Sequence, residues 1–435
     1  MPDGLSDAIV PDGLPDARLS DSVRNSGMPD GLSNAGVPDR LSDTCLSDGL
    51  PDRSMLLMNA SISTPIQTVC MSDSRFCNAR CSYCPSRGMP VKERLSLPAL
   101  KRVVDFFVVY TNRAAQKPRE LGFVFNTLGE LSQGMDNVIG CADYVASINA
   151  TGGCVAPLYF FTSSTNLMEA PDALVQHINR VGYLTVSLHG KLVKEYAARL
   201  AKFDIHVVKE GTDVIPKRPV NLFARYQEIL GQFNLASMRP VREAPMTTED
   251  SSLWIEEISE FVRTLAALPD AELATFLPRL AFNDTLLNAV KLLDAGAKLR
   301  CRCAAGIFSL QVTPEMEFYP CMFAQHPDLR MGDIERGIDA DWHRRFEARR
   351  RADARRECAS CEFLGPCAGG CLDWARKDPA SDGFFSHAEC LYRRGVFTIA
   401  AQFLEHVKGR PPVLEALRGH LNLQKREWRP QSKRG

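Results

Sequence analysis

The sequence of 435 residues lacks several features that mark specialised classes of protein. No apolar run approaches the roughly 18 residues that a membrane-spanning helix needs. The amino terminus also lacks the basic and then apolar segments of a secretory signal. Net charge is absent as well, because 52 basic and 52 acidic residues cancel, so no overall field draws the chain to nucleic acid or membranes. We expect a cytoplasmic protein that binds neither a membrane nor nucleic acid, and whose partners bind at local sites.

Aromatic residues are almost missing from residues 1–54, which are built on a near-duplicate of 27 residues: Met1–Ser6 recurs as Met28–Ser33. A segment this rich in Pro, Asp, Gly and Ser cannot bury enough apolar surface to offset the entropy lost on ordering. We predict that it is a disordered, low-complexity segment. A docking tail is one interpretation, but the composition favours a duplicated extension ahead of a start near Met55 or Met58.

From about residue 65 onward, short apolar runs alternate with longer amphipathic stretches. This alternation is typical of β/α units that build a parallel sheet. The expected strands are Leu121–Asn126, Leu158–Thr162, Tyr183–Leu188, Ile205–Val208 and Phe233–Met238, and the expected helices include Leu97–Tyr110 and Ala170–Val181. We predict a barrel-like or open α/β domain over residues 65–290. In residues 301–390 cysteines crowd and periodicity fades, which suits loops held by metal.

Fifteen cysteines are more than a cytoplasmic chain uses for packing, and thiols stay reduced in that compartment. Three of them, Cys77, Cys81 and Cys84, have CxxxCxxC spacing. Three thiolates can hold three irons of a [4Fe–4S] cube and leave the fourth iron open. The alternatives are a buried helical stripe of cysteines and a zinc site. The polar residues between the cysteines and Pro85 after them favour a loop around a cofactor, and structural zinc wants four ligands.

This motif, with the aromatic Tyr83 before its last cysteine, resembles that of the radical S-adenosylmethionine (radical SAM) superfamily. Thr127–Glu130 looks like the GGE segment of that family, Phe161–Asn166 like its STNG strand end, and Ser187–Gly190 like its SLDG-like strand end. The resemblance implies a partial (β/α)6 TIM-like barrel and S-adenosylmethionine on the open iron. The implied cofactor-binding residues are Tyr83, Gly129, Glu130, Ser163, Thr165, Asn166 and Ser187.

Eight further cysteines lie within residues 301–390, enough for two clusters with four thiolates each. Their spacing, with Tyr319–Cys321 and Met331–Ile334, resembles the SPASM domain, a small cysteine-rich module that binds auxiliary clusters. We place this domain at residues 300–395, with a C-terminal helix and tail at 396–435. The resemblance implies one cluster on Cys301 or a substitute, Cys303, Cys321 and Cys371, and another on Cys358, Cys361, Cys367 and Cys390. A pair of zinc ribbons is the alternative.

The resemblance implies an enzyme that reductively cleaves S-adenosylmethionine to a 5′-deoxyadenosyl radical, which abstracts hydrogen from a substrate. It implies three [4Fe–4S] clusters and an electron donor such as flavodoxin or ferredoxin. SPASM relatives mostly modify peptides or proteins, so a peptide substrate is expected. Met322 stands where relatives that mature sulfatases have an aspartate, which argues against that activity.

Two alternatives to a peptide substrate stay open. Residues 1–54 cannot fold into a winged-helix peptide-recognition domain, so either a separate protein presents the peptide or the substrate is a small molecule such as a tetrapyrrole. A non-catalytic iron–sulfur or zinc scaffold is the rival from a different class.

The remaining candidates carry little chemistry of their own. Cys45, Cys70, Cys141 and Cys154 match no ligand position, and we interpret them as ordinary thiols. Acidic residues interrupt the arginine-rich stretch 344–356, so a solvated helix face explains it better than nucleic-acid binding. His189 and Asp204 are candidates for substrate contact or for a structural role. No catalytic acid or base is identified.

Overall fold

The protein is described here from a computed structural model. The residues that it describes are 65–76, 94–125, 128–129, 134–164, 172, 183–188, 193–202, 208–215, 221–240, 246–281, 285–299, 301, 303–351, 355–379 and 381–427. Statements about structure below refer to these residues.

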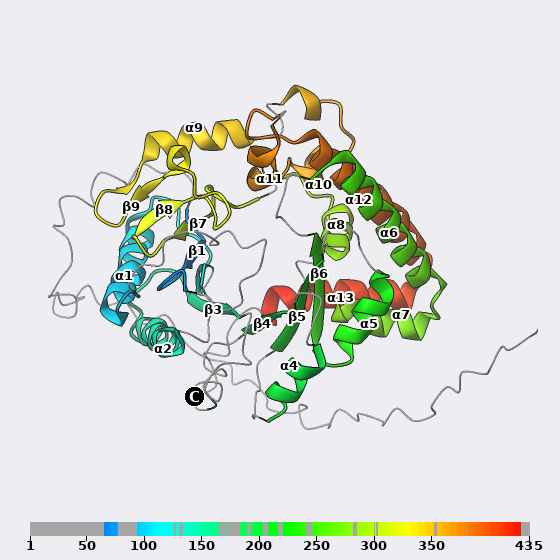
Figure 1. The fold of residues 1–435 in the computed structure, drawn as a ribbon, viewed down its shortest axis with the longest axis horizontal. Helices are drawn as coiled ribbons and strands as arrows, with labels where there is room; N and C mark the ends of the chain where they lie inside the picture. The colour runs from blue at the N-terminus through cyan, green and yellow to red at the C-terminus, as the bar shows by residue number, and fades with distance from the viewer. Residues whose placement is uncertain are drawn as a thin grey trace, which may run out of the picture. The chain divides into compact units, whose positions relative to one another are not determined.

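Six parallel strands follow one another in chain order through the middle of the fold (Figure 1). They are β1 (Thr68–Met71), β2 (Leu121–Phe125), β3 (Leu158–Ser164), β4 (Tyr183–Ser187), β5 (Val208–Ile215) and β6 (Leu235–Pro240). Each strand pairs in parallel with the next, so the order never reverses as it does in a doubly wound sheet. The predicted α/β class with a partial TIM-like barrel is confirmed.

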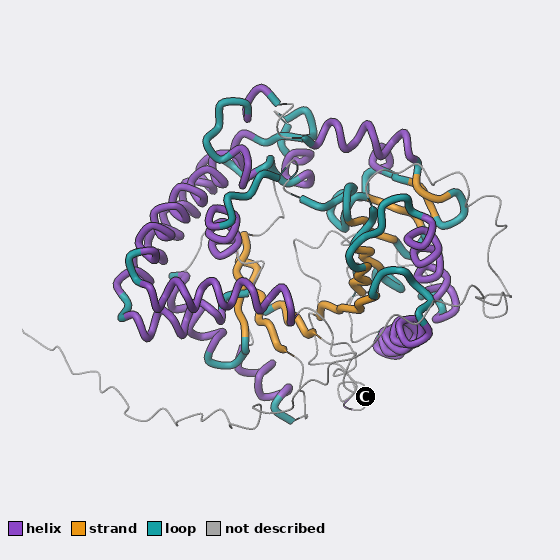
Figure 2. The backbone as a smooth tube through the Cα atoms, turned by 180° about the vertical axis from the view of Figure 1, so that it is seen from behind, coloured by secondary structure: helices purple, strands orange, loops and turns teal. Residues whose placement is uncertain are grey.

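Helices connect these strands and lie outside the sheet, as the purple and orange segments of Figure 2 show. They are α1 (Leu97–Arg113), α2 (Met135–Thr151), α4 (Val193–Leu200), α5 (Leu222–Leu230) and α6 (Thr248–Ala267). Local sequence determines where they begin. The Ser96 side chain accepts a hydrogen bond from the Ala99 amide at the start of α1, and Thr247 and Asp250 form a capping box at the start of α6.

The sheet continues beyond β1 into the cysteine-rich part of the chain. Strand β7 (Ser309–Val312) pairs in parallel with β1, and β8 (Glu317–Tyr319), β9 (Gly332–Asp333) and β10 (Gly337–Ile338) follow in antiparallel order. Phe318 of β8 packs against Phe106 and Phe107 of α1, with ring centroids 5.4 Å apart in both cases. Segments on both sides of the predicted domain boundary near residue 300 thus share one sheet and one core.

The other helices lie mostly in the second half of the chain. They are α7 (Asp270–Phe276), α8 (Thr285–Asp294), α9 (Ala340–Arg350), α10 (Leu364–Cys367), α11 (Leu372–Lys377), α12 (His387–Lys408) and α13 (Pro411–Glu427), with short 3₁₀ turns at Leu277–Arg279, Pro327–Leu329 and Arg356–Cys358. Helix α12 runs beside α6 and α8 (Figure 1). Among the described helices, none combines the length and apolarity needed to cross a bilayer.

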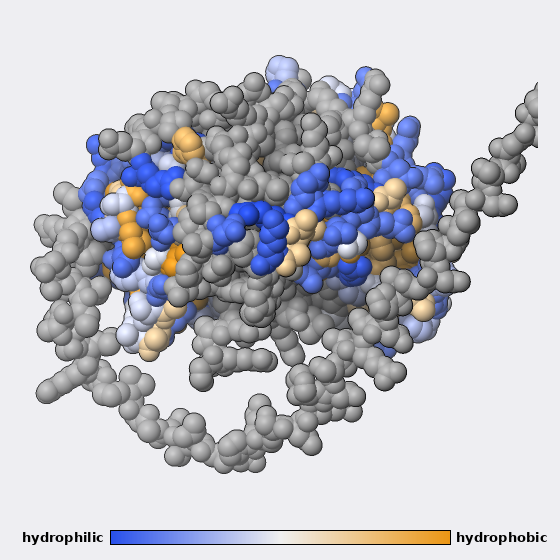
Figure 3. Space-filling view, turned by 60° about the horizontal axis from the view of Figure 1, so that its bottom comes forward, coloured by the Kyte–Doolittle hydropathy of each residue, from blue (hydrophilic) through white to orange (hydrophobic). Residues whose placement is uncertain are grey.

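One face of the described surface is largely hydrophilic, with hydrophobic residues in small separate patches (Figure 3). Scattered exposed apolar residues of this kind are normal for a folded protein.

Most of the predicted elements are confirmed, and the differences have local causes. Strand β5 begins only at Val208, where the predicted strand ends, because its polar residues Lys209, Glu210, Thr212 and Asp213 hide it from a search for apolar runs. Strand β1 was not among the predicted strands. The predicted helix Ala170–Val181 and the predicted disordered segment 1–54 fall outside the described residues, except for Asp172, which is helical.

Replacing Phe107 by alanine tests the shared core. Because Phe107 is fully buried between α1 and β8, the change should lower the free energy of unfolding by about 3–5 kcal/mol. Urea unfolding followed by circular dichroism measures the loss. Phe308, which is 38% exposed, provides the matched control, and Phe308→Ala should cost clearly less. Equal losses in the two variants would contradict the packing described here.

Candidate metal and cofactor site

The segment that leads into the CxxxCxxC motif is a buried polar stretch at the carboxyl end of β1. Ser72, Asp73 and Ser74 are each at most 3% exposed. Asp73 accepts a hydrogen bond from the Asn137 side-chain amide of α2 at 2.9 Å and pairs with Arg94 at 3.4 Å, and its backbone oxygen accepts from the Leu95 amide at 2.8 Å. Residues 77–93, which contain the CxxxCxxC motif, are called the motif loop below. The Asp73 carboxylate precedes this segment, and it connects to Arg94, which follows the segment, and to Asn137 of α2.

Gly129, a predicted cofactor-binding residue, packs directly on this stretch. A Cβ atom at Gly129 would lie 2.8 Å from the Ser74 carbonyl oxygen and 3.1 Å from that of Phe76. The neighbouring Leu128 amide donates to the Ser72 hydroxyl at 2.8 Å. Only glycine allows this approach of two backbones, so the structure brings Leu128 and Gly129 against the residues that lead into the motif.

Arg75 connects the same stretch to the cysteine-rich region. Its side chain is 9% exposed, and the guanidinium group forms an ion pair with Glu315 in the turn between β7 and β8 and donates to the Gln325 side chain at 3.1 Å. Burial raises the pKa of Glu315, but hydrogen bonds from Arg75 and Thr313 and the charge of Arg75 outweigh burial and hold that pKa below its ordinary value. Glu315 therefore stays ionised as a partner for Arg75.

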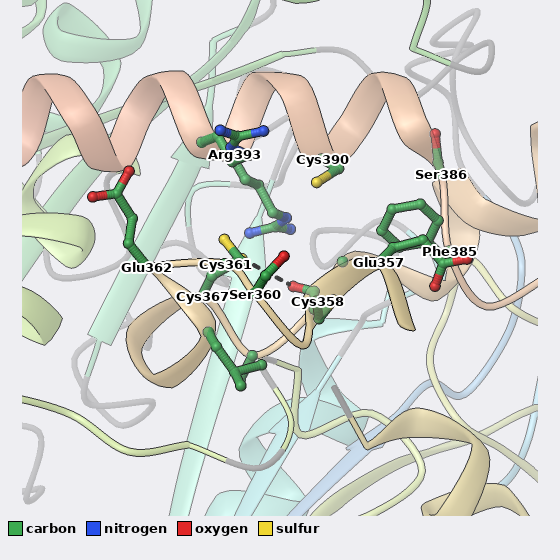
Figure 4. A pocket seen from close by; sticks show the side chains of 15 residues that line it. Glu357, Cys358, Ser360, Cys361, Glu362, Cys367, Phe385, Ser386, Cys390 and Arg393 are labelled. Atoms are coloured by element: carbon green, nitrogen blue, oxygen red, sulfur yellow. Dashed lines mark hydrogen bonds between the residues drawn. The ribbon is translucent and has the colours of Figure 1, made fainter. Parts of the chain in front are cut away.

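Four of the predicted ligands, Cys358, Cys361, Cys367 and Cys390, line one cavity of about 230 Å³ (Figure 4). We call these four residues the first thiol group. The Cys361 amide donates to the Cys358 carbonyl at 3.0 Å, which forms a tight turn, while Cys367 ends α10 and Cys390 lies in the first turn of α12. Ser386 caps α12 by accepting from the Glu389 amide, and this cap holds the first turn over the cavity.

The electrostatics of the first thiol group show that its members lie close together. The pKa of Cys390 is raised to about 11, first by burial and then by the neighbouring charges of Cys367, Cys358 and Cys361. Burial also raises the pKa of Cys358, and Cys367 and Cys361 raise it further against the opposing charge of Arg355. These four cysteines are the residues of the second ligand set that the family resemblance implied, and their binding of a cluster stays a prediction.

A second set of cysteines, which we call the second thiol group, consists of Cys321 and the two cysteines whose charges act on it, Cys303 and Cys371. The pKa of Cys321 is raised to about 12, first by burial and then by the charges of Cys371 and Cys303. Cys301 packs, like Cys321, against a small apolar cluster around Ile307 and Phe346. The described cysteines are all free thiols.

Cys70 is a neighbour that the sequence interpretation missed. It lies on β1, and its pKa is raised to about 12, first by burial and then by the charge of Cys303. Sequence spacing does not reveal this neighbour, because Cys303 is far from Cys70 along the chain and β1 itself was not predicted. The interpretation of Cys70 as an ordinary thiol stays a prediction, with Cys303 close enough for its charge to act on Cys70.

Several predicted site residues fall outside the description. The described residues do not include Cys77, Cys81, Cys84, Tyr83, Glu130, Thr165 and Asn166. The side chains of Ser163 and Ser187 are not described either. The backbones of those two serines lie at the carboxyl ends of β3 and β4, the edge where α/β folds bind ligands. Among the described residues, no three His, Cys, Asp or Glu side chains are grouped for a single metal ion.

Comparison with solved structures identifies proteins of the same fold. The structure of histidine-tagged anSMEcpe with bound AdoMet has a TM-score of 0.60 and 14% identity, over 83% of this chain and 99% of that chain. Native anSMEcpe with bound AdoMet and the Kp18Cys peptide has a TM-score of 0.58 and 14% identity, over 79% of this chain and 99% of that chain. No protein-family model and no curated protein sequence matches the chain. At this identity the likeness shows the fold.

Replacing Asp73 by alanine tests the tie at the base of the motif loop. Asn137 and Arg94 would lose a buried acceptor, so the free energy of unfolding should fall by about 1–3 kcal/mol. Urea unfolding measures it. Asp136→Ala, which removes an exposed carboxylate from the first turn of α2, should cost less than about 1 kcal/mol. If the two losses were equal, Asp73 would have no special role.

The Arg75–Glu315 pair predicts a pH dependence. Because the pKa of Glu315 is lower in the folded state, its stabilisation is complete above the ordinary value of 4.5 and is lost as the pH falls through the folded value. The stability gap between the wild type and Glu315→Gln should therefore be largest near pH 7 and shrink in acid. Urea midpoints across this range measure the gap. Glu335→Gln, at an exposed pair with Arg102, should show a smaller gap at every pH, and a gap for Glu315→Gln that grew in acid would contradict the pairing.

Proposed function

We propose that this chain is a radical S-adenosylmethionine enzyme with a C-terminal SPASM-type domain, and that it modifies a peptide or protein. One observation carries the proposal. Thiols from separate segments gather in two groups, while the first strand of a TIM-like barrel leads directly into a CxxxCxxC motif. Three clusters of the [4Fe–4S] type, one that binds S-adenosylmethionine and two auxiliary ones, would account for all eleven predicted ligands: Cys77, Cys81, Cys84, Cys301, Cys303, Cys321, Cys358, Cys361, Cys367, Cys371 and Cys390.

The first thiol group fits an iron–sulfur cluster in size and in chemistry. Its cavity of about 230 Å³ far exceeds the ~10–15 Å³ that one water molecule occupies, so it has room for more than a single ion. Four thiols with no histidine or carboxylate among the predicted ligands form the soft donor set that iron–sulfur clusters use. Because thiols bind metal as thiolates, cluster assembly would also remove the protons that burial now favours.

The fold supports the cofactor and the substrate class. The structures of similar fold are of a protein with bound AdoMet, and two of them also contain a peptide. When bound, the cluster and S-adenosylmethionine would supply the electron transfer and the radical that removes hydrogen from an unactivated carbon.

The residues of this chain would hold that chemistry in place. Asp73 fixes both ends of the motif loop, and Gly129 brings a second backbone segment against its base. Tyr83, Glu130, Ser163, Thr165, Asn166 and Ser187 complete the proposed cofactor-binding set. Arg75 joins this region to the turn between β7 and β8 before Cys321, and in the proposal this contact would connect the cofactor site to the auxiliary site.

Partners follow from the same proposal. The enzyme would need a low-potential electron donor such as flavodoxin or ferredoxin, and a separate recognition protein would present the peptide. Modification of a small molecule such as a tetrapyrrole is the second candidate. A non-catalytic iron–sulfur or zinc scaffold is less favoured, because such a scaffold would not need Gly129 to pack against the residues that lead into the motif.

Anaerobic reconstitution followed by assay tests the proposal. The wild type should bind about 12 irons per chain, from three four-iron clusters, and release 5′-deoxyadenosine with dithionite. Cys81→Ala should abolish that release and lose about four irons. Cys361→Ala should lose a similar amount of iron yet keep some uncoupled release, because it affects an auxiliary cluster alone.

Cys154→Ala provides the control, because this thiol matches no ligand position and should keep full iron content. Release of 5′-deoxyadenosine from Cys81→Ala at the wild-type rate would overturn the proposal. So would zinc in place of iron in protein purified without oxygen.

A further inference from the structure

A buried ion pair lies between the two thiol groups. Glu389, next to Cys390 in the first turn of α12, is fully buried, and both of its carboxylate oxygens accept from the Cys371 amide at 2.7 Å. One turn later, the Arg393 Nε atom donates to the same carboxylate at 2.6 Å, and this guanidinium side chain is only 16% exposed. The pair thus connects a residue of the second thiol group to the helix that carries Cys390.

The surrounding chain is shaped to admit this carboxylate. A Cβ atom at Gly370 would lie 2.4 Å from a Glu389 oxygen, so only glycine fits before Cys371. Ala368 and Gly369 have φ angles of 47° and 90°, and this left-handed turn directs the chain from Cys367 to Cys371. A fully buried charge is costly unless it is paired, and the packing around Glu389 keeps Arg393 as its partner.

Arg393 is close to both thiol groups at once. It lines the cavity of the first thiol group (Figure 4). Burial lowers the pKa of Arg393, but the charges of Glu389, Cys367 and Cys371 outweigh burial and raise it above its ordinary value. Cys367 belongs to the first thiol group and Cys371 to the second, so one permanent cation lies within electrostatic range of both.

We propose that Glu389 and Arg393 are positioning residues that set the reduction potentials of the two auxiliary clusters. The inference rests on the proposed function, since it requires clusters on both thiol groups. A nearby cation favours the reduced, more negative form of a cluster and raises its potential, while a nearby carboxylate lowers it. In the wild type the opposite charges of Arg393 and Glu389 would largely cancel in their effect on both potentials. The Cys371 amide donates to Glu389 and would therefore not donate to a cluster sulfur.

The two single substitutions should shift the reduction potentials of the auxiliary clusters in opposite directions. Arg393→Met leaves the Glu389 carboxylate without its cation, so the auxiliary potentials should shift to more negative values. Glu389→Gln leaves the cation without its carboxylate, so they should shift to more positive values. The double variant removes both charges and should lie between them, and Arg393→Lys should stay close to the wild type because it keeps the charge.

The potentials are measured by redox titration followed by electron paramagnetic resonance, on anaerobically reconstituted full-length protein. A Cys81→Ala background restricts the signals to the auxiliary clusters. Arg394→Met is the matched control, because Arg394 lines the same cavity but is exposed, and solvent should screen its charge. Iron content is measured in parallel, and loss of Arg393 should weaken cluster retention by about 10-fold or more.

The outcomes separate this inference from the proposed function. Opposite shifts in the two single variants, both larger than that of Arg394→Met, support a role in setting the potentials. Shifts in the same direction, or none beyond the control in protein with full iron content, overturn it and leave the proposed function standing. Should one single variant fail to fold, comparing the other single variant with the double variant still isolates the effect of one charge: removing Arg393 from Glu389→Gln should shift the potentials to more negative values, and removing Glu389 from Arg393→Met should shift them to more positive values. A background protein that binds no auxiliary iron overturns both.

Discussion

A buried thiol among other thiols has a raised pKa, because each neighbouring thiolate repels a further negative charge. A bound metal cation reverses this effect and favours the thiolates. Buried thiols with a raised pKa occur in both the first and the second thiol group, because burial and mutual repulsion raise the pKa of Cys390 to about 11 and that of Cys321 to about 12. Grouping seven thiols in this way has no benefit for a metal-free core, which would favour apolar side chains. The arrangement would become favourable if metal replaced the protons, and the proposed function of the C-terminal part of the chain depends on that exchange.

The sheet determines where the remaining chemistry can occur. Its parallel strands end at one edge, and the polar stretch from Ser72 to Arg75 leaves β1 at this edge. Asp73 closes the base of the motif loop, while Arg75 reaches the turn between β7 and β8. Because β7 pairs with β1, the cysteine-rich region is part of the same sheet as the barrel. The two proposed cofactor regions therefore share one rigid support.

Local patterns in the sequence predicted a large part of this structure. Apolar runs located β2, β3, β4 and β6, and the crowding of cysteines predicted that residues 301–390 are loops held by metal. The division of these cysteines into two groups was implied by a family resemblance, because spacing alone would place Cys371, four residues after Cys367, in the first thiol group. The same limit applies to Arg75 and Glu315, which are 240 residues apart. Cys70 and Glu389 escaped notice because only the folded chain brings Cys70 near Cys303 and Glu389 against the Cys371 amide.

The central claim is that one iron, near the end of β1, has only three sulfur ligands and room for S-adenosylmethionine. Electron paramagnetic resonance of reduced, oxygen-free protein, recorded with and without S-adenosylmethionine, tests this most directly. The account predicts that one of three cluster signals changes shape and position when the cofactor is added, while the two auxiliary signals stay as they were. A spectrum in which no signal responds to the cofactor would contradict it.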